Sequence, residues 1–380
     1  MKNSFLPTSL LLIIVAIFSC QPDDSGPSIA PPRDRGPQAI VDANKIKAFL
    51  NNYTYNDLDF NISEGVDRVK SEGLTHNDIQ FIRIVNATTG AKIELTAKQK
   101  LISSGTSLLN SKLLDSIPNI NVSGVNHTVY FLKIREGQGK LVTNIDPIFI
   151  GYRGNKISRS FIDETNLEIQ IGGTFDNREL PVWLKNDENI IGFSAVTSQF
   201  KTAIPVFNPK INEIQDERQR QLRQCQVFET AENGTISTIE NSYAIGAMFI
   251  PSGLGYYDNR NPRGQFNANG INPYENLLFT FSLYNTEYAD LDNDGIPSLL
   301  EDLNRDNDYS NDDTDGDGVP NFVDADDDGD GTATISEITI DDVELEIDSN
   351  CDGILTNDKN VIFIDNNSNS IFDHLDATIK

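Results

Sequence analysis

Hydrophobic and polar positions alternate along much of the middle of this 380-residue chain, and this alternation predicts β-strands. The alternating runs occupy residues 128–134, 147–152, 167–171, 243–250 and 277–283. Earlier in the chain, Ile46, Phe49, Leu50 and Tyr53 have the spacing of an amphipathic helix, for which Asp42 is the expected N-cap. The pattern therefore predicts an α+β fold in which a β-sheet dominates.

Two stretches interrupt this pattern. Residues 204–238 are polar and contain a charged run at 213–223, so we expect an inserted helix or loop there. Residues 54–125 combine a short β-like run at 81–85 with polar turns. No chemistry can be assigned to residues 54–125 from the sequence.

The first twenty residues predict an export signal. Lys2 supplies a positive end, and residues 10–18 form an apolar run that is too short for a stable membrane-spanning helix. The tetrapeptide Ile-Phe-Ser-Cys that ends at Cys20 resembles a bacterial lipobox, in which Cys20 would be lipidated. An ordinary cleaved signal with an incidental cysteine is the alternative. The resemblance implies an exported lipoprotein of the outer membrane that faces either the periplasm or the surface.

A short polar segment follows the expected lipidation site. Asp23 and Asp24 resemble the surface-export signal of some Gram-negative lipoproteins, and a plain polar tether is the equal alternative. Residues 25–38 are rich in Pro and Gly and lack periodicity. We therefore predict a flexible linker over residues 21–40.

The net charge of −27 is concentrated at one end of the chain. Residues 286–380 contain 28 acidic and three basic residues, whereas the first 285 residues contain 29 acidic and 27 basic residues. This distribution argues against a nucleic-acid partner, because phosphate binding needs a basic surface. With three His and three Cys, the chain is also a poor candidate for zinc, haem or iron–sulfur chemistry.

Six segments of the alternating region follow one another in a recognisable order. They are a strand and Gly-x-Gly turn at 130–139, a strand ending in Tyr-Arg-Gly at 146–154, Gly-Gly-Thr-Phe-Asp at 172–176, Ile-Ile-Gly-Phe at 190–193, Ile-Pro-Ser-Gly-Leu-Gly-Tyr at 250–256, and Gly-Ile-Asn-Pro leading into a strand at 270–279. In this order they resemble the FKBP-type peptidyl-prolyl cis-trans isomerases over about residues 128–285. The resemblance implies an FKBP-like antiparallel β-sheet wrapped on a short helix.

The resemblance also implies an apolar pocket for a proline ring. Its walls would be Tyr152, Phe175, Trp183, Ile190, Phe193, Tyr256, Ile271 and Phe279. Asp176 would accept a hydrogen bond from the Tyr256 hydroxyl, and the Ile190 amide would hold the substrate carbonyl. Phe161 and Asp163 are a rival for the Phe-Asp pair, because their distance from the preceding Tyr is closer to the usual one.

The chemistry of proline isomerisation suits such residues. Rotation about an X–Pro bond has a barrier of about 18–20 kcal/mol and needs no nucleophile or cofactor. An apolar aromatic cradle favours the twisted amide, whose carbonyl is less polar. Phe193 replaces the Trp that the family has at the pocket floor, and the alternative is that these aromatic residues are plain core residues of a β-domain.

The acidic tail contains a repeat with the spacing of calcium loops. The pattern D-x-D-x-D-G-x5-E occurs at 290–301 and 326–337, a copy at 313–324 ends in Asp, and a looser copy begins at Asp302. The carboxylates predicted to bind calcium are Asp290, Asp292, Asp294, Glu301, Asp313, Asp315, Asp317, Asp324, Asp326, Asp328, Asp330 and Glu337. Alternate acids place hard oxygen ligands around one ion, and Gly permits the sharp turn.

The short period of this repeat leaves no room for helix–loop–helix pairs. The run instead resembles thrombospondin type 3 calcium repeats, which implies an irregular calcium-loop tail with a structural role for calcium. Residues 348–353 and 365–376 look like degenerate copies. A solvated acidic linker is the alternative.

Together these features predict six regions. They are a signal peptide at 1–20, a linker at 21–40, a mixed N-terminal region at 41–127, an FKBP-like domain at 128–285 with an insertion at 204–238, calcium repeats at 286–340, and a degenerate tail at 341–380. We expect a membrane-anchored isomerase that assists the folding of exported proteins, with proline-containing polypeptides as partners. The alternatives are a non-catalytic module that binds proline segments and a structural or adhesive surface protein. The client proteins and the oligomeric state are left open.

Overall fold

The computed structural model describes only part of the chain. The described residues are 31–60, 73–86, 89–139, 141–161, 167–186, 189–203, 242–258, 270–287, 289–306, 308–340 and 361–379. The predicted export signal, the lipidation site at Cys20 and the insertion predicted at 204–238 lie outside them. Within the described part, no helix is both long enough and apolar enough to cross a membrane.

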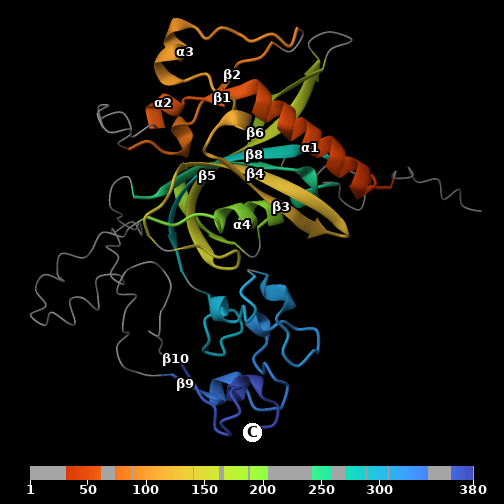
Figure 1. The fold of residues 1–380 in the computed structure, drawn as a ribbon, viewed down its shortest axis with the longest axis vertical. Helices are drawn as coiled ribbons and strands as arrows, with labels where there is room; N and C mark the ends of the chain where they lie inside the picture. Colours follow the sequence, from red (N-terminus) through yellow and green to blue (C-terminus); the bar gives the residue numbers. More distant parts are fainter. Residues whose placement is uncertain are drawn as a thin grey trace, which may run out of the picture. The chain divides into compact units, whose positions relative to one another are not determined.

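A six-stranded antiparallel sheet forms the centre of the body (Figure 1). Its strands are β3 (Leu114–Val122), β4 (Val125–Arg135), β5 (Pro147–Phe161), β6 (Leu167–Lys185), β7 (Ala244–Ile250) and β8 (Asn276–Thr286). They lie in the order β3-β4-β7-β8-β5-β6. Each predicted strand of the alternating region is present, whereas β3 was not predicted. The α+β class is confirmed.

One face of the sheet packs against the short helix α4 (Ile191–Thr197). Phe193 and Val196 of α4 are buried against side chains of β4, β5, β7 and β8. A Cβ atom on Gly192 would lie only 2.5 Å from Ile250, so glycine is needed for the helix to approach β7 this closely. This arrangement matches the prediction of a sheet that packs against a short helix.

The opposite face of the sheet is covered by α1 (Arg35–Asn52). The side chains of Ile46, Phe49 and Leu50 pack there with alternate residues of β4 and β7, which point away from α4. The helix begins earlier than predicted: Asp34 is the N-cap, and its side chain accepts a 3.0 Å hydrogen bond from the Gly36 amide. The sheet is therefore buried on both faces.

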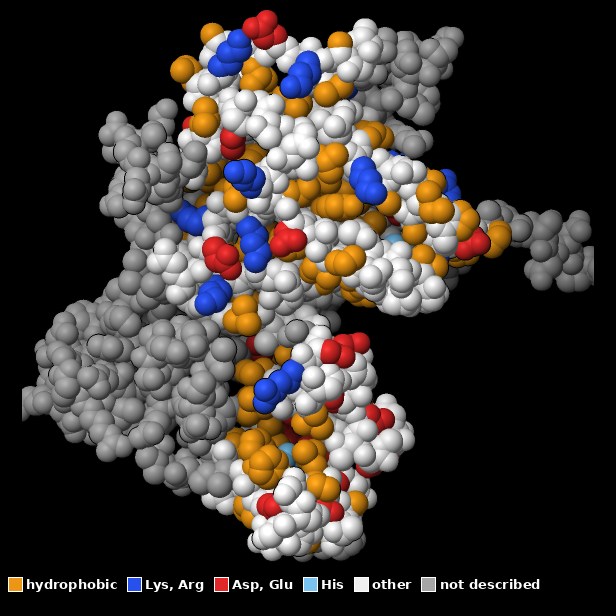
Figure 2. Space-filling view, viewed as in Figure 1, with side chains coloured by type: hydrophobic (Ala, Val, Ile, Leu, Met, Phe, Trp, Pro, Cys, Tyr) orange, Lys and Arg blue, Asp and Glu red, His pale blue; other side chains and the backbone are white. Residues whose placement is uncertain are grey.

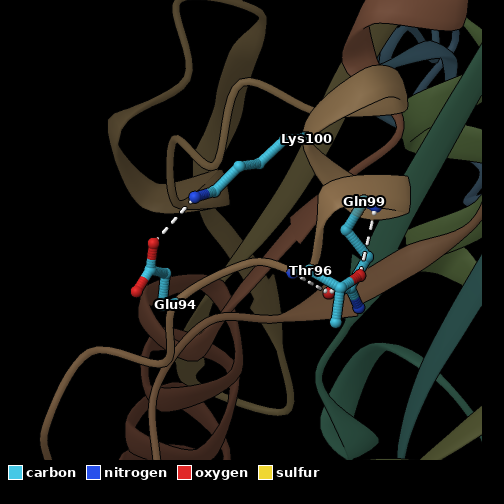
Figure 3. Close-up of polar contacts among 4 residues, drawn as sticks. All are labelled: Glu94, Thr96, Gln99 and Lys100. Carbon is cyan, nitrogen blue, oxygen red and sulfur yellow. Dashed lines mark hydrogen bonds and ion pairs between the residues drawn. The ribbon is translucent and has the colours of Figure 1, made fainter.

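Small elements complete the layer on the α1 side. They are β1 (Tyr53–Tyr55), β2 (Phe81–Arg83), α2 (Asp57–Phe60), α3 (Ala97–Ile102) and the 3-10 turns η2 (His76–Asp78) and η3 (Leu108–Asn110). Thr96 and Gln99 form a capping box at the start of α3, and Lys100 pairs with Glu94 at 2.8 Å (Figure 3). Much of the mixed N-terminal region thus belongs to the same core as the sheet.

The tail consists mainly of loops and short 3-10 turns. The turns are η6 (Ser298–Leu300), η7 (Tyr309–Asn311), η8 (Asn321–Val323), η9 (Thr334–Ser336) and η10 (Asp373–Leu375), and a small ladder joins β9 (Ile338–Ile340) to β10 (Val361–Phe363). In Figure 2 the Lys and Arg side chains are scattered mainly over the body, whereas the tail shows mainly acidic and apolar ones. The apolar cluster of the tail is small and centres on Ile296, Ile338 and Val361.

Candidate functional site

Four aromatic rings meet on the α4 face of the sheet. One of them, Phe279 of β8, contacts the other three. The Phe279 ring lies 5.1 Å from Phe193, 5.4 Å from Phe175 and 6.1 Å from Tyr152, measured between ring centroids. The first two pairs are T-shaped, which is a favourable geometry for aromatic rings. The sequence had predicted all four residues as pocket walls. We refer to Tyr152, Phe175, Phe193 and Phe279 as the aromatic cluster.

The close approach of two aromatic rings explains why residue 154, two residues after Tyr152, is glycine. A Cβ atom on Gly154 would lie 2.6 Å from the Phe175 ring and 2.9 Å from the Phe279 ring. Both distances are far below van der Waals contact. Only glycine therefore lets the two rings meet over β5.

Asp176 is held by Tyr152. The Tyr152 hydroxyl donates a 2.7 Å hydrogen bond to Asp176 Oδ2, and burial together with the nearby carboxylate raises the pKa of Tyr152 to about 12. The expectation that Tyr256 is the donor is therefore wrong. The pKa of Tyr256 is raised, mainly by burial and secondly by the nearby charge of Asp176. The carboxylate thus faces both tyrosines and bonds the buried one.

The surroundings of the aromatic cluster are partly exposed. Ile271 is buried in the hydrophobic core that contains Tyr152, Phe193 and Phe279, Ile190 is partly buried against that core, and Tyr256 is 40% exposed. Ile190 is the residue before α4, and its carbonyl accepts from the Phe193 amide at 2.8 Å. Among the described residues no acceptor bonds the Ile190 amide, so this N–H is available at the position where the sequence predicted a donor.

Trp183 does not join the cluster. Its neighbours on β6, Val182 and Leu184, pack on the α4 face, so Trp183 points to the other face by strand alternation. Its ring lies 5.2 Å from Phe149, which in turn contacts Tyr284 of the α1-side core. The prediction that Trp183 walls the pocket is therefore wrong.

The Gly-Gly-Thr-Phe-Asp segment at residues 172–176 lies within the long strand β6. Gly154 pairs with Asp176 and Asn155 pairs with Thr174, so Phe175 is an extra residue in the ladder. Such a β-bulge redirects a side chain, and here it turns Phe175 toward the cluster. The rival Asp163 lies outside the described residues, while Phe175 and Asp176 both make contacts at the site.

Sequence reasoning missed the role of Asp42. It is completely buried within α1, where its carboxylate accepts from the Gln38 amide group at 2.7 Å and from both the amide and the hydroxyl of Ser252. Burial raises the pKa of Asp42 despite these bonds. Asp42 thus ties α1 to the segment that carries Tyr256.

Four loops of the tail share one backbone conformation. We call them loop A (290–301), loop B (313–324), loop C (326–337) and loop D (365–376). In each, the sixth amide donates to the first carboxylate at 3.0–3.2 Å, and the seventh amide donates to the fifth side chain at 2.7 Å. The fourth and sixth residues have positive φ, which explains the glycines of loops B and C.

Loops A, B and C bring carboxylates together in the predicted way. Within each loop the first, third and fifth Asp offer oxygen atoms that all lie within 4.8 Å of one another. Loop D has Asn at its third and fifth positions and forms no such group. The final acids, Glu301, Asp324 and Glu337, each lie near the carboxylates of their own loop. Calcium ions favour such oxygen donors.

The carboxylates of the tail are crowded enough to perturb each other. Burial, followed by the charges of neighbouring acids, raises the pKa of Glu301 to about 10, of Asp327 to about 8 and of Asp292 to about 7. Carboxylic acids with such values retain protons at neutral pH unless a cation offsets their charge. The loops therefore have the donor set and the electrostatics of cation sites.

Comparison with known proteins gives a partial picture. The BamM C-terminal family model matches residues 291–368, which is the tail and less than half of the chain. No curated protein matches the sequence.

Among solved structures, the chain is similar to a peptidyl-prolyl cis-trans isomerase from Pseudomonas syringae pv. tomato, with 14% identity, a TM-score of 0.26, and coverage of 47% of this chain and 84% of the other. It is also similar to FkpA from Escherichia coli, with 16% identity, a TM-score of 0.25, and coverage of 47% of this chain and 53% of FkpA. These likenesses are too slight to carry an argument, so the assignment of function depends on the site itself.

Proposed function

We propose that the body is a peptidyl-prolyl cis-trans isomerase of the FKBP type. The observation that carries the proposal is the aromatic cluster around Phe279, with the Tyr152–Asp176 pair beside it. Its residues come from β5, β6, β8 and α4 and fall on the positions that the ordered sequence motifs had marked.

The cluster can favour the twisted amide without any covalent step. A proline ring placed against Phe279 and Phe193 would bring its X–Pro bond out of water, which disfavours the planar, more polar amide. The Ile190 amide, which bonds no acceptor among the described residues, would donate to the carbonyl of the residue before proline. Partly exposed side chains at the rim, Phe175, Ile190 and Tyr256, would contact the rest of the peptide.

A proline-isomerisation assay on the purified full-length chain tests this proposal. We expect a rate above background that Phe279→Leu reduces several-fold, because the change removes one ring from the centre of the cluster. Phe281→Leu is the matched control: this residue is also buried on β8, but its ring packs on Phe200. A folded chain that binds a proline peptide without accelerating isomerisation would refute the enzyme and support the non-catalytic binding module.

We further propose that the tail binds calcium through loops A, B and C, as a structural ion. The shared loop geometry and the three groups of converging carboxylates support this. Few apolar side chains of the tail are buried together, so ions would supply the cross-links that a larger core would otherwise provide. The body and the tail would then serve separate purposes, catalysis and spacing.

Trypsin offers a simple test of the calcium proposal. Arg305 is the only Lys or Arg between residues 286 and 358, and its side chain is exposed. We expect rapid cleavage after Arg305 in the presence of a chelator and slow cleavage in calcium. Equal rates in both conditions would favour the acidic-linker alternative.

The proposed location is the outer membrane of a bacterial envelope, with the chain anchored by lipid at Cys20. The export signal and the lipobox-like sequence support this. In this setting the enzyme would act on proline-containing segments of exported proteins. A structural or adhesive role remains the alternative, and deletion of residues 286–380 followed by an assay of surface assembly distinguishes it from a folding role.

A further inference from the structure

Asp327 is an acid that the calcium-loop pattern does not require. It occupies the second position of loop C, where loops A, B and D have Leu291, Thr314 and Asn366. Its amide donates to the Thr334 hydroxyl at 3.1 Å, a local bond of the same kind that the second residue makes in the other loops. The backbone role of this position is thus ordinary, and only the side chain needs an explanation.

The Asp327 carboxylate is buried beside loop A. Its side chain is 2% exposed, and an oxygen atom of Asp327 lies within 4.8 Å of oxygen atoms of both Asp294 and Glu301. Asp294 and Glu301 are themselves 1% and 3% exposed. Three fully buried acids from two different loops therefore converge on one point.

Five of the six carboxylate oxygen atoms of these buried acids lack a hydrogen-bond partner within the described part of the chain. Both oxygen atoms of Asp327, both oxygen atoms of Glu301 and Oδ2 of Asp294 have none. A buried carboxylate without a partner is strongly unfavourable, and three that face each other are more so. Oxygen ligands of one calcium ion lie about 2.3–2.6 Å from it, so they lie within about 5 Å of one another. The spacing of the three acids fits a shared cation.

We propose that Asp327 of loop C is a ligand of the calcium site of loop A, together with Asp294 and Glu301. This inference rests on the proposed calcium binding by the tail. Its consequence is that one ion holds together two loops that are separated in the sequence by loop B and the looser copy that begins at Asp302. The tail would then be a closed cluster of loops, and its first and third calcium loops would order together.

Calcium titration of the full-length chain, first stripped with a chelator, tests this through a double-mutant design. We expect Asp327→Asn to bind one calcium ion fewer per chain than the wild type. Glu301→Gln should lose the same ion, so the combined variant should lose no more than either single variant. Glu337→Gln removes the final acid of loop C, and its combination with Asp327→Asn should lose two ions.

The matched control is Asp308→Asn, which makes the same charge change at an exposed acid whose carboxylate caps Ser310. It should keep the wild-type number of ions. The fluorescence of Trp183, the single tryptophan, checks that the body of each variant is folded. Since Asn is nearly isosteric with Asp and removes repulsion, Asp327→Asn is expected to fold.

The outcomes separate the two proposals. A wild-type chain that binds no calcium would overturn both. Wild-type binding that Asp327→Asn leaves unchanged would overturn the link between loops and leave the loops themselves as calcium sites. Losses that add with Glu301→Gln, but not with Glu337→Gln, would assign Asp327 to its own loop and overturn the proposal as well. Trypsin provides a second readout: in calcium, Asp327→Asn should be cleaved after Arg305 about tenfold faster than the wild type.

Discussion

The hydrogen bond between Tyr152 and Asp176 gives a prediction that separates catalysis from stability. Tyr152→Phe removes only the hydroxyl and keeps the ring against Phe193 and Phe279. The bond is short, at 2.7 Å, and its acceptor is charged, but the Asp176 side chain is 37% exposed, so water can replace the lost donor. We therefore expect a loss of about 1 kcal/mol in the free energy of unfolding.

The same change should slow isomerisation. Without the hydroxyl, Asp176 Oδ2 loses its donor beside the aromatic cluster. The Asn177 amide and Arg178 still contact Oδ1, so the carboxylate is held less firmly but not released. A loss of about 1 kcal/mol of transition-state stabilisation corresponds to a roughly fivefold lower kcat/KM. Asp176→Ala should act through the same bond, so the double variant should lose about 1 kcal/mol less stability than the sum of the single variants.

Tyr243→Phe is a close control for this experiment. Tyr243 and Tyr152 are both 7% exposed, and Tyr243 donates a hydrogen bond of equal length, 2.7 Å, to the Leu74 carbonyl. However, Tyr243 belongs to the core on the α1 side of the sheet. Its loss should cost a similar amount of stability without changing kcat/KM.

Urea unfolding followed by Trp183 fluorescence measures the stability of the body alone, because the tail contains no tryptophan. Hydrolysis-coupled turnover of a proline peptide measures kcat/KM. If Tyr152→Phe and Tyr243→Phe slow turnover equally, the effect is a general loss of stability. If Tyr152→Phe destabilises the body but leaves turnover unchanged, the reasoning about the pair is refuted.

Three further predictions concern packing, pH and anchoring. Gly154→Ala should destabilise the body by about 1–3 kcal/mol in urea unfolding, because its methyl group meets the Phe175 ring, whereas Gly173→Ala, which has open space around it, should be nearly neutral. Burial lowers the pKa of His76 to about 4 from its usual 6.5. The free energy of unfolding should therefore be highest above pH 6.5 and fall by about 3 kcal/mol as the pH drops to 4. His76→Asn should flatten this pH profile, and an unchanged profile would contradict the role given to His76. Cys20→Ser should move the protein from the membrane to the soluble fraction, and a variant that stays in the membrane would argue against lipidation.

The conformation of loops A, B and C could be predicted from the sequence because it is local. Every hydrogen bond that defines loop A, B or C joins residues of the same short segment. Each glycine at the sixth position has a positive φ, a conformation that glycine adopts without strain. The strands were readable for a similar reason, since a period of two marks a buried face. Neither inference needs knowledge of distant parts of the chain.

The side-chain contacts within the body could not be predicted from local sequence patterns. Trp183 and Phe175 are eight residues apart on β6, and a regular strand would put both on one face. Irregularities in the pairing of β5 with β6 break that count, so Phe175 joins the cluster and Trp183 does not. Which tyrosine bonds Asp176 depends on the same register.

Asp42 and Asp327 show what the tertiary structure alone decided. By sequence, Asp42 has the pattern of a helix cap, and Asp327 is one acid in a run of three. In the fold, Asp42 bonds Ser252, more than two hundred residues away, and Asp327 faces the acids of loop A. A local pattern reports which conformation a segment prefers, but the partner of a buried charge is set by which segments pack together, because a buried carboxylate must find its compensation in whatever surrounds it.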